Sequence, residues 1–196
     1  RCGGLLQWDA VQREGVYRHQ GQETEQAIRR ALFSCSARGT QWSLGAIVSA
    51  REGDIDAEQR LIQLQLKFAD ESNHWQWKIG KIREESGLES ATASRLLPLP
   101  SRSMLSDLHA PYFSWGTALS QTLDQHHWRY TVGVFYNEAF GAQGRSENGQ
   151  PNWAYSARLN WAPRQQGGDV LLFGVSFSDR RFDQNEKLSL RHGAEV

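Results

Sequence analysis

Apolar and polar residues alternate one by one along most of the chain, which is the period that a β-strand with two different faces requires. Residues 60–68, RLIQLQLKF, are the clearest example, because every second side chain from Ile62 onward is apolar. Ten segments follow the pattern and are predicted to be strands: residues 5–13, 27–37, 41–50, 60–68, 74–81, 112–123, 127–136, 152–161, 169–178 and 186–196. The sequence therefore predicts an all-β protein.

The connections between these segments alternate in length. The connections at 11–27, 51–58, 84–112 and 137–151 are long, those around Gly39, at 69–73 and at 124–126 are short, and 163–169 is intermediate. A soluble β-sandwich also alternates apolar and polar residues, so the period alone does not separate the two folds. Short turns at one end and long loops at the other are typical of a transmembrane antiparallel up-and-down β-barrel.

Aromatic residues support the membrane interpretation. Several of the eight tryptophans lie near predicted strand ends, where barrels carry aromatic girdles at the two membrane interfaces. The girdle candidates are Trp8, Trp42, Trp75, Trp128, Tyr136, Trp153 and Trp161. No run of about 18 apolar residues is present, so the sequence predicts no helical membrane span.

Charge and short motifs exclude several other classes of function. The 22 basic residues balance the 22 acidic ones, so no overall field attracts nucleic acid. The acidic run EGDIDAE lacks the ligand spacing of a calcium loop, and the adjacent His126 and His127 diverge in a turn, so no metal site or cofactor is expected. Cys2 and Cys35 are too few for a disulfide scaffold, and their role is left open.

Three segments resemble the phosphate-selective porin O and P family of Gram-negative outer membranes. They are AIRRALFSCSARGTQWSLGAIVSA, WQWKIGKIREESGLESATASR and WRYTVGVFYNEAFG, in the same order and spacing as in the family. One departure is GKIREES at 80–86, where the family usually reads Gly, Gln, Phe, Lys, Glu, Pro, Phe, and this leaves the transported solute open.

The resemblance implies a function and an assembly. It implies an outer-membrane porin that passes small anions such as phosphate or polyphosphate by diffusion, without covalent chemistry, as a homotrimer in outer-membrane lipid. Porins of this kind close with about sixteen strands. Residues 1–196 are therefore expected to be a single barrel domain, the N-terminal part of a longer porin.

The longest connection, residues 84–112, is predicted to fold inward as the constriction loop. The lumen of a sixteen-stranded barrel is too wide to select among small solutes unless a segment narrows it. Pro98 and Pro100 stiffen this loop, and Arg95 and Arg102 are expected to project from it into the channel. Guanidinium groups are always charged and present forked donors that match phosphate oxygens.

Basic residues at the polar parity of the strands are predicted to line the pore. They are Arg30, Lys67, Lys78, Arg129 and Arg158. Arg29 is a further candidate ranked below Arg30, because adjacent strand residues share a face only where a bulge intervenes. The alternative for each of these cations is that it only solvates the wall beside a neighbouring carboxylate.

Three other functions stay open at this point. A general diffusion porin with little anion preference fits the balanced charge. A soluble or surface β-sandwich binding module fits the alternation. Outer-membrane barrels can be lipid hydrolases, but the sequence spaces no serine and histidine in a recognisable catalytic pattern, so the protein is not expected to be an enzyme.

Overall fold

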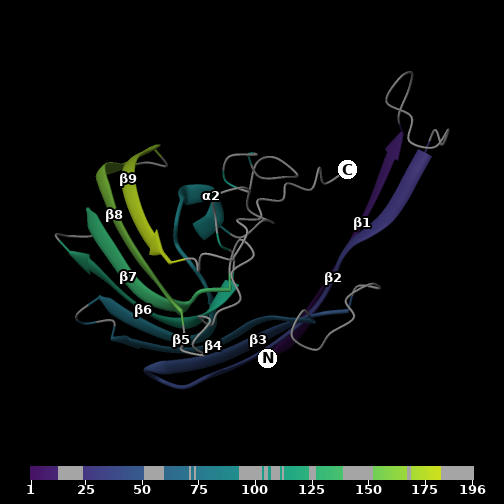
Figure 1. Ribbon diagram of the computed structural model, residues 1–196, viewed down its shortest axis with the longest axis horizontal. Helices are drawn as coiled ribbons and strands as arrows, with labels where there is room; N and C mark the ends of the chain where they lie inside the picture. Colours follow the sequence, from purple (N-terminus) through teal and green to yellow (C-terminus); the bar gives the residue numbers. More distant parts are fainter. Residues whose placement is uncertain are drawn as a thin grey trace.

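The computed structural model describes residues 1–12, 24–50, 60–70, 72, 74–92, 103, 106, 111, 113–123, 127–138, 152–166 and 169–181. In these residues the chain forms nine strands and a short helix, α2 (Leu88–Ala91) (Figure 1). The strands are β1 (Cys2–Gln12), β2 (Thr24–Arg38), β3 (Trp42–Ser49), β4 (Leu61–Asp70), β5 (Trp75–Arg83), β6 (Phe113–Leu123), β7 (Trp128–Tyr136), β8 (Trp153–Gln166) and β9 (Asp169–Arg180). No helix in this part of the chain is long and apolar enough to cross a membrane.

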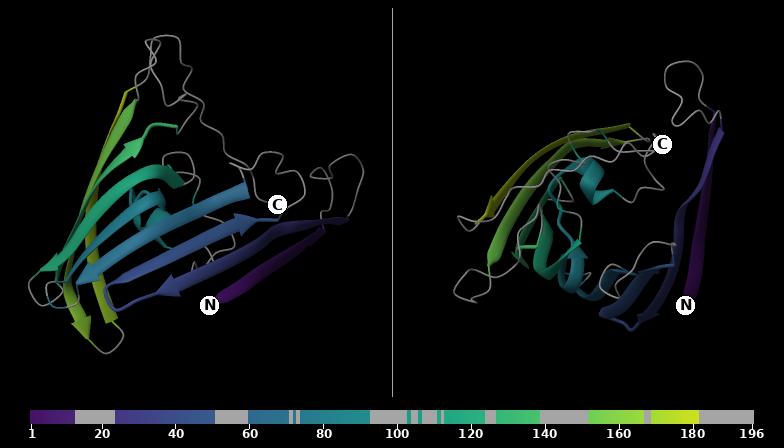
Figure 2. Two further views of the ribbon diagram at one scale, coloured as in Figure 1. Left: turned by 90° about the horizontal axis from the view of Figure 1, so that it is seen from below. Right: turned by 45° about the vertical axis from the view of Figure 1, so that its right-hand side comes forward.

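The nine strands pair antiparallel in chain order from β1 to β9, so they form one up-and-down sheet. The turns that join β2 to β3, β4 to β5 and β6 to β7 are short, as predicted, and the turn from β8 to β9, predicted to be intermediate, is short as well. These four turns lie at one end of the strands, and the long connections lie at the other. The sheet curves into an open trough with α2 on its concave side (Figures 1 and 2). A β-sandwich needs two packed sheets, so the single sheet of the described residues contradicts that alternative.

Nine of the ten predicted strands are confirmed, and the tenth, at 186–196, lies outside the described residues. The connection predicted at 11–27 is too long, because β2 begins at Thr24 rather than at residue 27, whereas β1 ends at Gln12, one residue before the predicted end of its strand at 13. Gln12 and Thr24 pair with each other through their backbones. Backbone pairing does not require side chains to alternate, so the apolar period gave no sign of it.

The predicted connection at 163–169 is also too long, because β8 runs through Pro163 to Gln166. Proline cannot donate a backbone hydrogen bond to a neighbouring strand and is tolerated at bulges. Pro163 fits this rule, since the pairing of β8 with β9 is irregular between Trp161 and Arg164.

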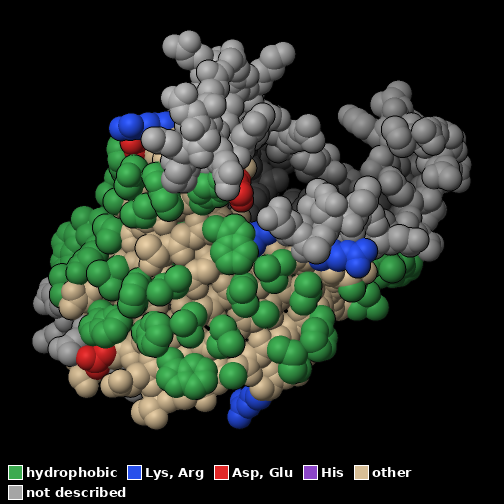
Figure 3. Space-filling view, turned by 60° about the horizontal axis from the view of Figure 1, so that its bottom comes forward, with side chains coloured by type: hydrophobic (Ala, Val, Ile, Leu, Met, Phe, Trp, Pro, Cys, Tyr) green, Lys and Arg blue, Asp and Glu red, His purple; other side chains and the backbone are tan. Residues whose placement is uncertain are grey.

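The convex face of the sheet is apolar. Val132 on β7 is 45% exposed on this face, whereas its neighbour Thr131, on the opposite parity, is 6% exposed. Hydrophobic side chains are spread over much of the visible part of this face in Figure 3. An exposed apolar surface of this extent is typical of a face that contacts another molecule or a membrane. The predicted separation of the two parities into an outward apolar face and an inward polar face is confirmed for β7.

Aromatic side chains gather at both ends of the strands. Trp128, at the start of β7, stacks on Trp161 with ring centroids 5.5 Å apart, and Trp161 stacks on Phe173 at 5.6 Å. At the opposite end of the strands, the rings of Tyr136 and Trp153 pack edge-to-face with their centroids 6.3 Å apart. Trp128 and Tyr136 are the two ends of β7, so they lie about 26 Å apart at about 3.3 Å per residue. Strands of outer-membrane barrels are tilted by about 35–45°, so this length corresponds to roughly 19–22 Å of height, which is most of an apolar band about 25 Å tall.

A small apolar core lies on the concave side of the sheet, near the strand ends that carry the long connections. It consists of Ile82, Ala118, Phe135 and Ala154. The ring of Phe135 lies over Gly116 and Gly133, where a Cβ atom on either glycine would overlap it. The two glycines therefore leave the room into which an inward-facing aromatic ring packs.

β2 has a bulge at its two adjacent arginines, Arg29 and Arg30. Gln7 pairs with Arg30 and Trp8 pairs with Ile28, so Arg29 is the extra residue of the bulge. Sequence reasoning required a bulge before Arg29 and Arg30 could face the same way, and the backbone has one at this point.

Cys2 and Cys35 form a disulfide between directly opposite residues of β1 and β2, with their Cα atoms 4.1 Å apart. Within the described sheet β1 pairs with β2 alone. The disulfide therefore fixes the register of an edge strand that would otherwise be held by backbone hydrogen bonds on one side.

Candidate functional site

The chain turns inward directly after β5. Glu85 is close enough to Lys78 on β5 for Lys78 Nζ to donate a hydrogen bond to Glu85 Oε1 at 3.0 Å. Had the chain stayed extended, seven residues would separate their backbones by about 23 Å, beyond the reach of the two side chains. Residues 84–92 therefore run back over the concave face of the sheet, as Figure 1 shows for α2.

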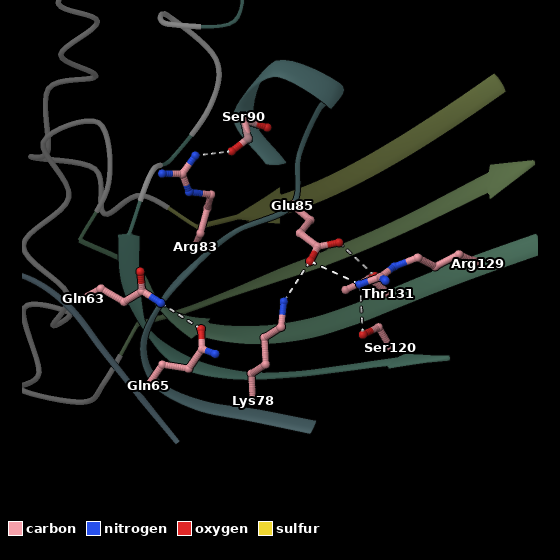
Figure 4. A network of polar contacts seen from close by, with 9 residues as sticks. All are labelled: Gln63, Gln65, Lys78, Arg83, Glu85, Ser90, Ser120, Arg129 and Thr131. Atoms are coloured by element: carbon pink, nitrogen blue, oxygen red, sulfur yellow. Dashed lines mark hydrogen bonds and ion pairs between the residues drawn. The ribbon is translucent and has the colours of Figure 1, made fainter. Parts of the chain in front are cut away.

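Glu85 joins two strands of the wall (Figure 4). Its Oε1 lies 3.0 Å from Lys78 Nζ and 3.6 Å from Arg129 Nη2, and its Oε2 accepts a hydrogen bond from Thr131 Oγ1 at 3.2 Å. Burial raises the pKa of Glu85, but the charges of Lys78 and Arg129 and the hydrogen bonds lower it more, so the pKa lies below its ordinary value of 4.5. The carboxylate is therefore charged at neutral pH.

The register of the strands brings further cations to the same region. Lys67 on β4 pairs directly with Lys78 on β5. On its other side Lys67 pairs with Ser43 on β3, and Ser43 pairs in turn with Arg38 on β2. Arg38 therefore lies level with Lys67, two strands away. Arg38, Lys78 and Arg129 all act electrostatically on Lys67. Like charges so close repel one another and raise the positive potential that an entering anion meets.

Arg158 on β8 is the most deeply buried of these cations, at 7% exposure. Its Nε donates to Asn160 Oδ1 at 2.9 Å. Its Nη1 is buried and has no hydrogen-bond partner among the described residues. A buried donor without a partner costs roughly 1 to 3 kcal/mol, so this nitrogen favours any acceptor that reaches it.

Two pockets adjoin this group of cations on the concave side. The larger, about 550 Å³, lies between the inward segment and the wall, and its polar lining is Glu85, Thr122, His127, Arg129, Arg158 and Asn160. The smaller, about 300 Å³, is lined in part by Lys67, Gln76, Thr122 and Arg129. Thr122 and Arg129 line both pockets, so the two pockets adjoin along the wall.

Glu84, next to Glu85, has different partners. It is fully buried, accepts a hydrogen bond from Ser114 Oγ at 2.7 Å and forms an ion pair with Arg180 on β9. Arg180 also donates to Asn137 Oδ1 at 3.2 Å. Burial raises the pKa of Glu84, and Arg180 and Ser114 offset only part of this effect, so the pKa lies above its ordinary value of 4.5.

Other contacts hold the same inward segment in place. Arg83 Nη1 donates to the backbone oxygens of Ser90 and Thr92 at 2.8 and 2.9 Å, and its guanidinium lies 4.8 Å from the centre of the Phe113 ring. Ser176 on β9 donates to the backbone oxygen of Ser86. The segment is thus attached to both β5 and β9.

Four of the predicted pore-lining residues come together in the structure: Lys67, Lys78, Arg129 and Arg158. Arg30 is separate. It precedes Arg38 on β2 by eight positions, which is about 26 Å along the strand. Arg29 lies beside it in the bulge, and Arg95 and Arg102 lie outside the described residues.

Sequence reasoning missed four residues of this region: Arg38, Glu84, Glu85 and Arg180. Arg38 has the same parity as Arg30 on β2, so alternation could have found it. Glu84 and Glu85 lie in a predicted loop and Arg180 lies just beyond the predicted end of its strand, where alternation gives no direction.

The grouping of these cations is chemically suited to reversible anion binding. Lys78, Arg129 and Arg158 offer ammonium and guanidinium donors within one region, next to the neutral donors of Thr131 and Asn160. Such a set replaces part of the hydration of an anion and carries no group poised for covalent chemistry.

Comparison with known proteins agrees with this chemistry. A search of curated proteins finds no match to the chain. The sequence profile of the family described as phosphate-selective porin O and P matches residues 1–193. This family is a class of channels rather than of enzymes, and its location is the outer membrane. The match covers nearly the whole chain, and the fold is the antiparallel sheet of a porin wall, so the protein belongs to the phosphate-selective porin O and P family.

Proposed function

We propose that phosphate and similar small anions pass along the concave face and bind transiently at the basic cluster, defined as Lys67, Lys78, Arg129 and Arg158. One observation carries the proposal. The buried Nη1 of Arg158 has no partner within the described residues, and Arg158 lines the pocket of about 550 Å³ together with Arg129. A phosphate oxygen at this nitrogen would satisfy a donor that the described protein groups leave unpaired.

We also propose that residues 84–112 form the constriction loop, with Arg95 and Arg102 adding to the positive lining. The support is the inward return of residues 84–92, which Glu85 reveals by contacting Lys78 and Arg129. A segment on the concave face reduces the width of the channel beside the basic cluster. Arg30 and Arg29, lying farther along the wall, would then attract anions before they reach the narrow part.

Reconstitution in planar lipid bilayers tests the anion site. Replacing Arg158 with Met removes the charge but keeps an unbranched side chain of similar length. We expect the Arg158→Met porin to need several-fold more phosphate to block half of the chloride current, and to show a smaller chloride-over-potassium permeability ratio. Arg164→Met is the matched control, because the side chain of Arg164 is 64% exposed and lies at the end of the strands with the short turns. Equal phosphate block in both variants would favour a general diffusion porin.

The family also leads us to propose a homotrimer embedded in outer-membrane lipid. The exposed apolar convex face supports contact with lipid. Chemical cross-linking of the purified porin in detergent tests the assembly, because a trimer gives a ladder that ends at three subunits.

A further inference from the structure

Glu85 is an acidic residue inside the basic cluster. Of the described residues that line the larger pocket, it is the one carboxylate, and Arg129 and Arg158 line the same pocket. Its Oε1 contacts both Lys78 and Arg129, and its charge also acts on Arg158. A carboxylate oxygen thus lies against two of the cations to which a phosphate oxygen would bind.

A purely mechanical role would be to pin the inward segment to the wall. That role already has other residues, since Glu84 pairs with Arg180, Ser86 accepts from Ser176, and Arg83 holds the residues around α2. Glu85 differs from these contacts in its surroundings. Its side chain is 16% exposed and lines an open pocket, whereas the side chain of Glu84 is 1% exposed.

We propose that Glu85 is a tethered counter-ion that sets the specificity of the channel by competing with the permeating anion for Lys78 and Arg129. This inference rests on the proposed anion site. A channel must bind its ion strongly enough to admit it and weakly enough to release it. A fixed carboxylate favours release of the anion, because it lowers the positive potential of the cluster and binds to Lys78 and Arg129 again whenever an anion leaves.

The competition predicts which anions gain from the removal of Glu85. The repulsion between the carboxylate and a divalent phosphate is about twice that between the carboxylate and chloride at the same distance. Glu85 therefore discriminates against multivalent anions more than against monovalent ones. Its loss should strengthen phosphate binding more than chloride permeation.

The variant Glu85→Gln tests the proposal in the intact porin. Glutamine keeps the length of the side chain and an oxygen that accepts from Thr131, but removes the charge. We expect the phosphate concentration that blocks half of the chloride current to fall by roughly tenfold, from the Coulomb energy of one charge in a partly solvated site. The chloride-over-potassium permeability ratio should rise at the same time.

Glu89→Gln is the matched control. Glu89 is also in the inward segment, and its Oε2 accepts hydrogen bonds from the backbone and hydroxyl of Ser103 at 2.9 and 2.8 Å. We expect this variant to resemble the unmodified porin in phosphate block. An equal gain in Glu89→Gln would overturn the proposal, because it would mean that any carboxylate of the segment has this effect.

Two further outcomes separate this inference from the proposed function. If Glu85→Gln leaves phosphate block unchanged while Arg158→Met weakens it, the anion site stands and the counter-ion role is wrong. If Arg158→Met and Glu85→Gln both leave the block unchanged, the anion site itself is wrong. Should Glu85→Gln fail to assemble, reversal potentials of the unmodified porin, followed as the pH is lowered from neutrality until they stop changing, give a second test, because protonation of Glu85 removes the same charge. Chloride selectivity that stays unchanged throughout this titration would then contradict the proposal.

Discussion

The buried pair of Glu84 and Arg180 gives the most quantitative prediction about stability. The two side chains are 1% and 7% exposed, so neither charge is screened by water to a useful extent. Replacing Arg180 with Met removes the cation and leaves the carboxylate buried, with its hydrogen bond from Ser114. Removing one partner of a buried ion pair costs about 3 to 5 kcal/mol. We expect the free energy of unfolding of Arg180→Met at neutral pH to fall by about that amount.

The pH dependence of this loss follows from the pKa of Glu84. Burial already raises that pKa above 4.5 while Arg180 is present, and loss of the cation raises it further. The folded variant then binds a proton more readily than the unfolded chain. Its stability is accordingly highest in acid and is lost as the pH rises from about 4.5 through the raised pKa. The destabilisation by Arg180→Met should therefore shrink as the pH falls.

Urea unfolding in detergent micelles, followed by tryptophan fluorescence, measures both effects. Arg164→Met is the control, because Arg164 and Asp169 form an ion pair at 3.5 Å whose side chains are 64% and 75% exposed. Such a pair contributes about 0 to 1 kcal/mol. The double variant Glu84→Gln, Arg180→Met removes both charges and should regain part of the loss. Equal losses in Arg180→Met and Arg164→Met, or no gain in the double variant, would refute the reasoning.

The sequence predicted the wall of this protein well because each wall residue faces one of two environments. The convex and the concave face carry different side chains, and the strand geometry alternates them, so Val132 and Thr131 reveal their directions by parity alone. The same parity correctly placed Lys67, Lys78, Arg129 and Arg158 on the concave side.

The alternation of apolar and polar residues does not predict the side-chain directions of residues outside the strands. Glu84 and Glu85 are adjacent and chemically identical, yet one pairs with Arg180 on β9 and the other with Lys78 and Arg129. Their directions depend on how the chain turns after β5 and on which strand lies across the trough. Only the curvature of the whole sheet determines that, so no local pattern could have separated the two carboxylates.

Three remaining predictions test the faces of the wall and the acid sensitivity of the inward segment. Val132→Arg places a cation on the lipid face and should reduce the free energy of folding into lipid by about 2 to 4 kcal/mol, whereas Gln65→Arg on the opposite parity should fold normally; equal folding yields on denaturing gels without heating would mean that the faces are misassigned. Gly133→Ala forces a Cβ into the ring of Phe135 and should lower the free energy of unfolding by about 1 to 3 kcal/mol, whereas Gly45→Ala, which has no heavy atom within 4 Å of the added Cβ, should change it little in the same urea assay. The last prediction concerns the ion pairs of Glu85, whose pKa is lowered below 4.5 in the folded state. A carboxyl group of this kind binds a proton less readily when folded, so its contribution to stability is complete above about pH 4.5 and is lost as the pH falls through the lowered pKa. The unmodified porin should therefore lose more stability between pH 5 and pH 3 than Glu85→Gln does, because glutamine has no proton to take up. Parallel acid titrations of the two proteins, followed by tryptophan fluorescence at fixed urea, measure the difference, and coincident curves would show that Glu85 gains no stabilisation from Lys78 and Arg129.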